Sequence, residues 1–135
     1  MKKILSVLVL SLLIVSLLTA AAPLPNTTFT LVQRLPAVMN VGETYTVIVQ
    51  VESDGPFLFA QALPSFQYVG KGVVAVQGGD HAGRGTSATL EITYRAKSST
   101  AKMPDGVAPV YAVVGVRYPG GYVAAQEYLF PVTVP

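Results

Sequence analysis

The sequence lacks cysteine and tryptophan, contains one histidine and is poor in charge, with 12% charged residues against a usual share of about 25%. The absence of cysteine excludes disulfide frameworks, cysteine-ligated zinc, iron–sulfur clusters and thiol nucleophiles. The low charge argues against a disordered tail, because such segments are highly charged and bury little apolar surface. The length of 135 residues suits one domain with a single hydrophobic core.

The first residues follow the order of a secretory signal peptide. Met1-Lys2-Lys3 is a short basic region, and residues 4–18 continue as an uncharged, mostly apolar signal helix. Thr19 and Ala21 are small residues that suit the positions before a cleavage site. We expect cleavage after Ala21 rather than one residue later, because the later cut would leave a proline at the new N-terminus.

A retained membrane anchor is the alternative interpretation of this leader. The uncharged stretch at residues 4–24 is close to the roughly 20 residues that span a bilayer, although its apolar part is shorter. No cysteine follows that could carry a lipid. We therefore expect a secreted or cell-surface protein that contacts a membrane only where the leader is retained. The predicted organisation is a signal peptide or anchor at 1–21, a tail at 22–27 and one domain at 28–135.

The formal charge of +2 and the isoelectric point near 9.0 come from the leader. Without Lys2 and Lys3, seven basic residues remain against seven acidic ones, so the mature chain is neutral. No cluster of Lys and Arg remains that would bind a phosphate backbone. We therefore expect no nucleic-acid partner.

Alternating apolar and polar residues predict strands along the mature chain, and no useful helical period appears after residue 22. Residues 44–52 and 87–97 place apolar side chains on one face and polar side chains on the other, as half-buried antiparallel strands do. Weaker strands are expected at 28–35, 57–63, 66–69 and 73–77, with Gly- and Pro-containing turns between them. This density of short strands in one domain predicts an all-β, two-sheet sandwich.

A hairpin ends the sequence, with its turn at Pro119-Gly120-Gly121. A three-residue loop pairs Tyr118 with Tyr122 and keeps the apolar stripes of both strands on one face, whereas a two-residue loop would place them on opposite faces. Pro131 has no N–H to donate, so we expect it to face solvent, a sheet edge or a bulge.

Three short motifs suggest a family. Residues 41–49 read Val-Gly-Glu-Thr-Tyr-Thr-Val-Ile-Val, residues 63–69 read Leu-Pro-Ser-Phe-Gln-Tyr-Val, and residues 89–94 read Thr-Leu-Glu-Ile-Thr-Tyr. They resemble strand motifs of the immunoglobulin-like surface modules of bacteria and archaea, of the DUF11/CARDB type. The chain departs from that family in being one domain alone and in having Glu52-Ser53-Asp54-Gly55-Pro56 after the second strand. The resemblance implies an immunoglobulin-like antiparallel β-sandwich of 7–8 strands that acts as a spacer or binding unit.

The glycine-rich segment at residues 78–85 carries Asp80, His81 and Arg84, which suggest a small metal-binding or hydrolytic site on a loop. His81 is the only histidine, so a metal would need Asp80 and carboxylates from elsewhere. No nucleophile elbow and no phosphate-binding motif accompanies them. A simple connection between strands is the favoured interpretation, and we expect no enzyme activity, no cofactor and no metal.

Glu52 and Asp54 offer a second, weaker hypothesis. With Asp105 they would supply oxygen ligands for calcium at one end of the sandwich. Acidic residues at strand ends are more often simply solvated, and we favour that interpretation.

The last hairpin also predicts an interaction surface. Side chains alternate between the two faces of a strand, and this alternation directs Tyr118, Tyr122 and Tyr128 to the core. Tyr111 alternates with the opposite phase and is expected on the outer face. An exposed apolar patch on that face would exceed what monomers usually carry. The adjacent run Phe57-Leu58-Phe59 is apolar on both faces and adds to it. The predicted partner-binding face consists of Tyr111, Val113, Val123 and Leu129.

Together these features predict a non-enzymatic secreted or cell-surface module for protein–protein interaction or adhesion. Self-association through an edge strand is also expected of such a sandwich. The alternative is a membrane-anchored accessory subunit of a larger envelope complex, held by uncleaved residues 4–24.

Overall fold

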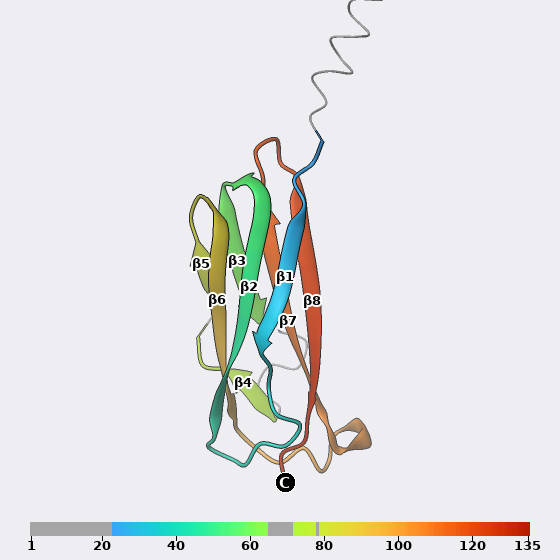
Figure 1. The fold of residues 1–135 in the computed structure, drawn as a ribbon. Helices are drawn as coiled ribbons and strands as arrows, with labels where there is room; N and C mark the ends of the chain where they lie inside the picture. Colours follow the sequence, from blue (N-terminus) through green and yellow to red (C-terminus); the bar gives the residue numbers. More distant parts are fainter. Residues whose placement is uncertain (1–22, 65–71, 78) are drawn as a thin grey trace, which may run out of the picture.

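The computed structural model describes residues 23–64, 72–77 and 79–135, which form two four-stranded antiparallel sheets packed face to face (Figure 1). The strand order is β1-β2-β6-β4 in the first sheet and β5-β3-β7-β8 in the second. The elements are β1 (Thr27–Gln33), β2 (Thr44–Phe57), β3 (Phe59–Pro64), β4 (Val73–Ala75), β5 (Asp80–Ala82), β6 (Gly85–Ala96), the short 3-10 helix η1 (Pro104–Gly106), β7 (Ala108–Arg117) and β8 (Val123–Val132).

This strand order is that of an immunoglobulin-type sandwich. Strands β1, β2, β6 and β4 take the places of strands A, B, E and D, and β3, β7 and β8 take those of C, F and G. Strand β5 extends the second sheet beside β3, after the chain has visited the first sheet at β4. The predicted all-β, immunoglobulin-like sandwich is therefore confirmed. The predicted signal helix lies outside the described residues, and within them no helix is long and apolar enough to cross a membrane.

The alternating pattern of the two strongest predicted strands builds one side of the core. In β2 and β6 the cross-strand pairs Val47–Ile92 and Val49–Leu90 are all buried. The polar residues between them point to the outer face of the first sheet, as period-two geometry requires. Both strands were predicted from this pattern, and both are confirmed.

The final hairpin has the predicted register. The Tyr118 N–H donates to the Tyr122 carbonyl at 2.8 Å, and Val116 lies opposite Ala124. Both apolar stripes therefore start on one face. Pro131 lies in β8, which is an edge strand of its sheet, so its missing N–H leaves the ladder intact, as expected. Tyr122 departs from the core prediction, since it is 38% exposed near the turn.

The boundaries of two predicted segments differ in the structure. Strand β2 continues to Phe57, through a segment expected to turn, because a shift of register lets the buried Phe57 pair with Gly85. The segment at 78–85, expected to be a loop, contains β5, which pairs with β3. Gly79 enters β5 at φ 124°, and a Cβ there would lie 2.3 Å from the Ala62 carbonyl oxygen. The strand expected at 66–69 lies outside the described residues.

Candidate functional site

The outer face of the second sheet carries the residues predicted to bind a partner. The cross-strand pairs Tyr111–Leu129 and Arg117–Val123 mark its two ends, and Val113 lies between them on β7. Val113, Val123 and Leu129 are 37%, 54% and 50% exposed, and Tyr111 is half-buried. The four predicted residues therefore share one face, which we call the β7–β8 face.

Strand β3 widens this face with residues that the sequence did not assign to it. Phe59 lies beside Arg117 and Leu63 lies beside Val113, and both apolar side chains are more than a third exposed. The run containing Phe59 was recognised as apolar on both faces, but Leu63 was missed. Assigning either side chain to this face requires the β3–β7 register, which no local pattern encodes.

A shallow depression occupies the centre of the β7–β8 face. Gly115 and Ala125 are cross-strand neighbours there, and because they carry no side chain and a single methyl group, the sheet surface is hollowed between larger residues. Arg117 is the one charged residue that lines it. The lining residues are Phe59, Gln61, Leu63, Val113, Gly115, Val116, Arg117, Val123 and Ala125.

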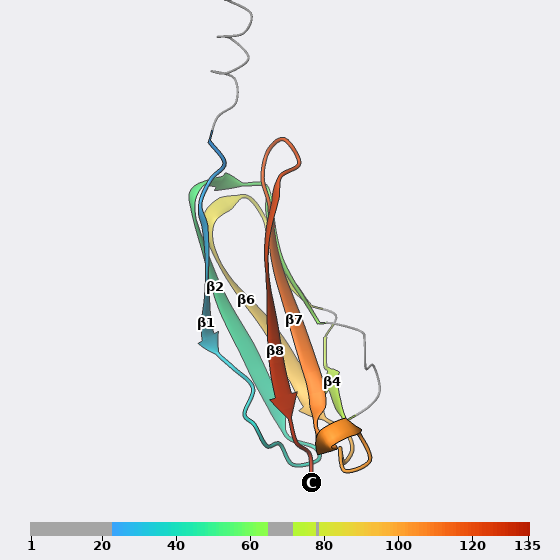
Figure 2. The same ribbon diagram turned by 90° about the vertical axis from the view of Figure 1, so that its right-hand side faces the viewer.

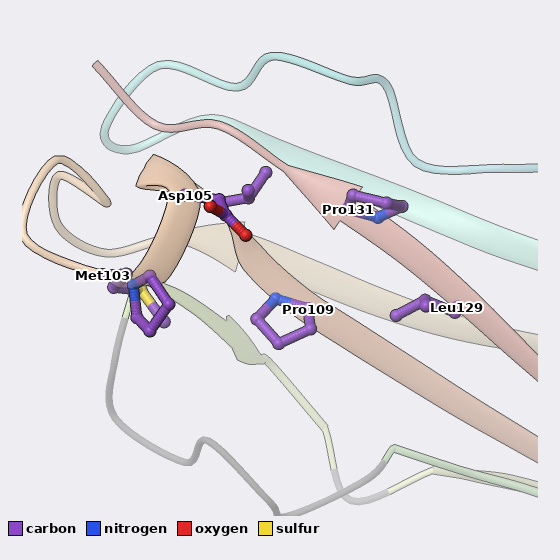
Figure 3. Close-up of a pocket in the computed structure, with 7 residues that line it drawn as sticks. Met103, Asp105, Pro109, Leu129 and Pro131 are labelled. Atoms are coloured by element: carbon purple, nitrogen blue, oxygen red, sulfur yellow. The ribbon is translucent and has the colours of Figure 1, made fainter.

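A second pocket continues the apolar surface toward the end of the sandwich near the C-terminus (Figure 3). Leu129 belongs both to this pocket and to the β7–β8 face, and the cross-strand pair Pro109–Pro131 forms its floor beside η1. Asp105 contributes a carboxylate and adopts φ 57°, a left-handed conformation that aspartate tolerates. The full lining is Met103, Pro104, Asp105, Val107, Pro109, Leu129 and Pro131.

The three polar residues of the glycine-rich segment do not converge on one point. The Asp80 carboxylate accepts two backbone hydrogen bonds at 2.8 Å, from the N–H groups of His81 and Glu91. It therefore fastens β5 to β6 rather than facing a substrate. The His81 ring stacks on Phe59 with ring centroids 5.8 Å apart, on the outer side of the sheet, and Arg84 is exposed beyond the strand.

The proposed calcium ligands are separated by the length of the sandwich, so that hypothesis is wrong. Glu52 and Asp54 lie near the end where the chain enters, since Asp54 bonds to Asn26. Asp105 lies in η1, at the opposite end near the C-terminus (Figures 1 and 3). Within the described residues no three His, Asp or Glu side chains gather in a way that could hold a metal ion.

The outer face of the first sheet has the opposite character. Its polar side chains bond to one another across the strands, with Thr46 and Thr93 hydroxyls 2.9 Å apart and the Gln50 amide donating to the Ser87 hydroxyl at 3.0 Å. Such mutually satisfied polar groups favour contact with water. The contrast marks the β7–β8 face as the apolar side of the molecule.

A buried tyrosine supports the β7–β8 face from beneath. The Tyr94 hydroxyl, on β6 of the first sheet, donates to the Tyr111 carbonyl on β7 at 3.2 Å. Tyr94 is 2% exposed, and burial raises its pKa above the ordinary value of 10.0. The strand that carries Tyr111 is thereby tied across the core.

Comparisons with known proteins find no matching family model and no matching curated protein. Among the solved structures that match are two with low sequence identity to this chain. One is Escherichia coli alpha-2-macroglobulin in its native conformation, with 19% identity, a TM-score of 0.46, and coverage of 85% of this chain but 7% of the macroglobulin. The other is murine CRIg, with 8% identity, a TM-score of 0.39, and coverage of 84% of this chain and 99% of CRIg. The resemblance to DUF11/CARDB-type modules stays a prediction.

Proposed function

We propose that this chain is a non-enzymatic, secreted or cell-surface immunoglobulin-like module that binds a protein through its β7–β8 face. The observation that carries the proposal is the alignment of half-exposed Val, Leu, Phe and Tyr side chains on one side of one sheet, opposite a polar face. Exposed apolar side chains gathered on one surface favour protein association, because burial against a partner removes them from water.

The layout of the face suits a protein partner. Its centre is apolar and hollowed at Gly115 and Ala125, so a partner side chain can seat there. Arg117 and Glu127 flank that centre, which resembles the polar rim of protein interfaces. Tyr111 adds aromatic area at low entropic cost.

The proposal is non-enzymatic because the candidate catalytic groups are otherwise engaged or apart. Asp80 accepts two backbone N–H groups, and His81 lies against Phe59. A hydrolytic or metal-dependent role would require these side chains to meet in a cleft, and none of them lines either of the two pockets described above.

The location outside the cytoplasm rests on the leader alone. A basic start, an apolar run at 4–18 and small residues at the expected cleavage site support export. Intact mass of the protein from its own cells separates the two forms. A mass lacking residues 1–21 supports the secreted or surface-released module, and a mass including them, found with membranes, selects the anchored accessory subunit.

A photo-crosslinking experiment tests the binding face. A photoreactive residue at Val113, at the centre of the β7–β8 face, is compared in the native host with one at Val32, which lies on β1 of the other sheet and is 61% exposed. We expect a discrete crosslinked protein from position 113 and none from position 32. Two matched substitutions in the chain without a photoreactive residue, Val113→Lys and Val32→Lys, should respectively abolish and preserve co-purification of the crosslinked protein.

Two outcomes would reject the proposal. Equal labelling from both positions would mean that the apolar face has no preferred partner. Absence of any product at position 113, with the protein folded and present in the envelope or medium, would mean that the face binds no protein there.

A further inference from the structure

The edge strands of the two sheets are unequally protected against pairing with a strand of another chain. Strands β4 and β5 have three residues each, β1 has a register shift between Leu31 and Gln33, and Asp80 caps the Glu91 N–H on β6. Short strands, irregular pairing and capping side chains all discourage edge-to-edge pairing. Strand β8 has ten residues in regular register, and no described strand pairs with its outer edge above the C-terminal end (Figure 2).

The hydrogen-bond pattern shows which backbone groups this edge presents. The Tyr118 N–H donates to the Tyr122 carbonyl, so the even-numbered residues of β8 bond to β7 and the odd-numbered ones point outward. Beyond the C-terminal end of β8, the odd-numbered Thr133 also points its N–H away from β7, since that N–H donates to the Ala37 carbonyl at 2.8 Å. Pro131 blocks the next outward position. The unpaired stretch is therefore Val123 to Leu129, with Gln126 at its centre.

We propose that a second copy of the chain pairs its β8 antiparallel with this edge, about a two-fold axis at Gln126. The two second sheets then become one continuous eight-stranded sheet. This inference rests on the proposed function, because it names a partner for the surface that includes the β7–β8 face. The four outward-facing residues are Val123, Ala125, Glu127 and Leu129.

The stretch is self-complementary in this register. Val123 of each copy lies opposite Leu129 of the other copy, so the two-fold axis produces this contact twice. The contact joins the apolar residues of the two β7–β8 faces across the new strand pair. Ala125 faces Glu127 of the second copy, so the two Glu127 carboxylates are not directly opposed. A register centred on Glu127 would place like charges opposite each other, which is unfavourable.

Charge permits a second copy, and the one side chain that caps this edge leaves room for it. The mature chain has seven basic and seven acidic residues, so two copies approach without net repulsion. The Gln126 side-chain amide donates to the Glu127 carbonyl at 3.1 Å and uses one of its two lone pairs. The carbonyl keeps a lone pair for the partner strand.

A cysteine scan reads both the association and its register, because the native chain has no cysteine. In the proposed register the two copies of residue 126 form a non-hydrogen-bonded pair, with Cα atoms about 4.5 Å apart, a spacing that a disulfide accepts. Residues 125 and 127 meet their own copies only diagonally, at about 7–8 Å. We expect Gln126→Cys to form a disulfide-linked dimer at least tenfold faster than Ala125→Cys, Glu127→Cys or the control Val32→Cys.

A proline substitution tests the backbone contact. Ala125→Pro removes an outward N–H from each copy and leaves the ladder to β7 intact, as Pro131 does at the same parity. We expect the dimer dissociation constant of the full chain, measured by sedimentation, to rise more than tenfold. Ala125→Ser keeps the N–H and should raise the dissociation constant far less than Ala125→Pro does. Circular dichroism and the urea midpoint check that both variants fold.

The results separate this inference from the proposed function. A chain that stays monomeric at millimolar concentration, with Gln126→Cys no faster than Val32→Cys, overturns self-pairing. If Ala125→Cys or Glu127→Cys forms the disulfide-linked dimer faster than Gln126→Cys, the proposed register is wrong. If Val113 still crosslinks a different protein in either case, the binding function stands and only the second copy is rejected. Dimerisation with no other adduct supports the inference and limits the function to self-association.

Discussion

Two buried tyrosine hydroxyls join distant strands at the scale of single residues. The Tyr118 hydroxyl lies 2.5 Å from the Thr27 hydroxyl and 2.6 Å from that of Ser53, which links β7's end to β1 and β2. Tyr94 reaches the Tyr111 carbonyl from the opposite sheet. Parity placed Tyr118 in the core correctly. Its hydroxyl partners were not predictable, because they come from strands far apart in the sequence.

Replacing Tyr94 by Phe should change how stability depends on pH. Burial holds the pKa of Tyr94 above the ordinary value of 10.0, so above pH 10 the unfolded chain loses this proton while the folded chain keeps it. The free energy of unfolding of the wild type should therefore fall by about 1 kcal/mol between pH 10 and 11. In Tyr94→Phe this contribution should be absent. Urea denaturation at pH 10 and at pH 11 measures the difference in unfolding free energy.

The exposed Thr133 provides a control that removes a hydroxyl group that does not titrate in this range. Thr133→Val should keep the wild-type loss of stability at high pH, because it leaves Tyr94 in place. Identical pH dependence in wild type and Tyr94→Phe would contradict the assignment.

The glycine-rich segment shows how residue chemistry alone misleads. Asp80, His81 and Arg84 are residue types found in active sites, although a simple connection between strands was the favoured interpretation. In the structure Asp80 satisfies two backbone N–H groups and His81 packs against Phe59. An aspartate side chain serves either role, and only the position of β6 beside it decides which.

At the scale of elements, alternation and turn chemistry were enough for β2, β6 and the β7–β8 hairpin. Their side chains repeat with period two, and an odd loop is the one that keeps both hairpin stripes on one face. Strand β5 was missed because three residues between glycines carry no period. The extension of β2 was missed because its pairing of Phe57 with Gly85 follows a register shift.

Thr100 fastens the C-terminal end of β8 to the loop before β7. Its fully buried hydroxyl donates to the Gly106 carbonyl at 2.6 Å and accepts from the Val134 N–H at 2.9 Å. Thr100→Val should cost about 1–3 kcal/mol of unfolding free energy, because it leaves that buried N–H without its partner.

Chemical denaturation with urea measures this loss. The exposed neighbour Thr133 is the control, and Thr133→Val should change the free energy by no more than about 0.5 kcal/mol. A Thr100→Val variant as stable as Thr133→Val would show that the hydroxyl does not fasten this end.

At the scale of the whole molecule, one core stands between two unlike surfaces. Buried residues from both sheets form a single cluster, from Leu35 to Val134. The first sheet turns mutually bonded Thr, Ser and Gln outward, and the second turns Val, Leu, Phe and Tyr outward. With no cysteine in the chain, this core and the hydrogen-bonded sheets around it stabilise the sandwich without a disulfide.

The single core predicts cooperative unfolding. Loss of either sheet exposes the apolar face of the other, so neither sheet should persist alone. Far-ultraviolet circular dichroism and tyrosine fluorescence should give one urea midpoint, since the chain has no tryptophan to dominate the emission. Two separate midpoints would mean that the sheets unfold as independent units.

The sequence by itself determined the fold class, the two strongest strands, the hairpin register and the parity that puts Tyr111, Val113, Val123 and Leu129 on one face. These follow from periods and turns that act within a few residues. Only the tertiary structure decided that Phe59 and Leu63 join that face, that Asp80 caps a strand, that the acidic residues lie at opposite ends, and that β8 is the least protected edge. Each depends on which strands become neighbours, and that is settled by packing across the core between residues far apart in the chain.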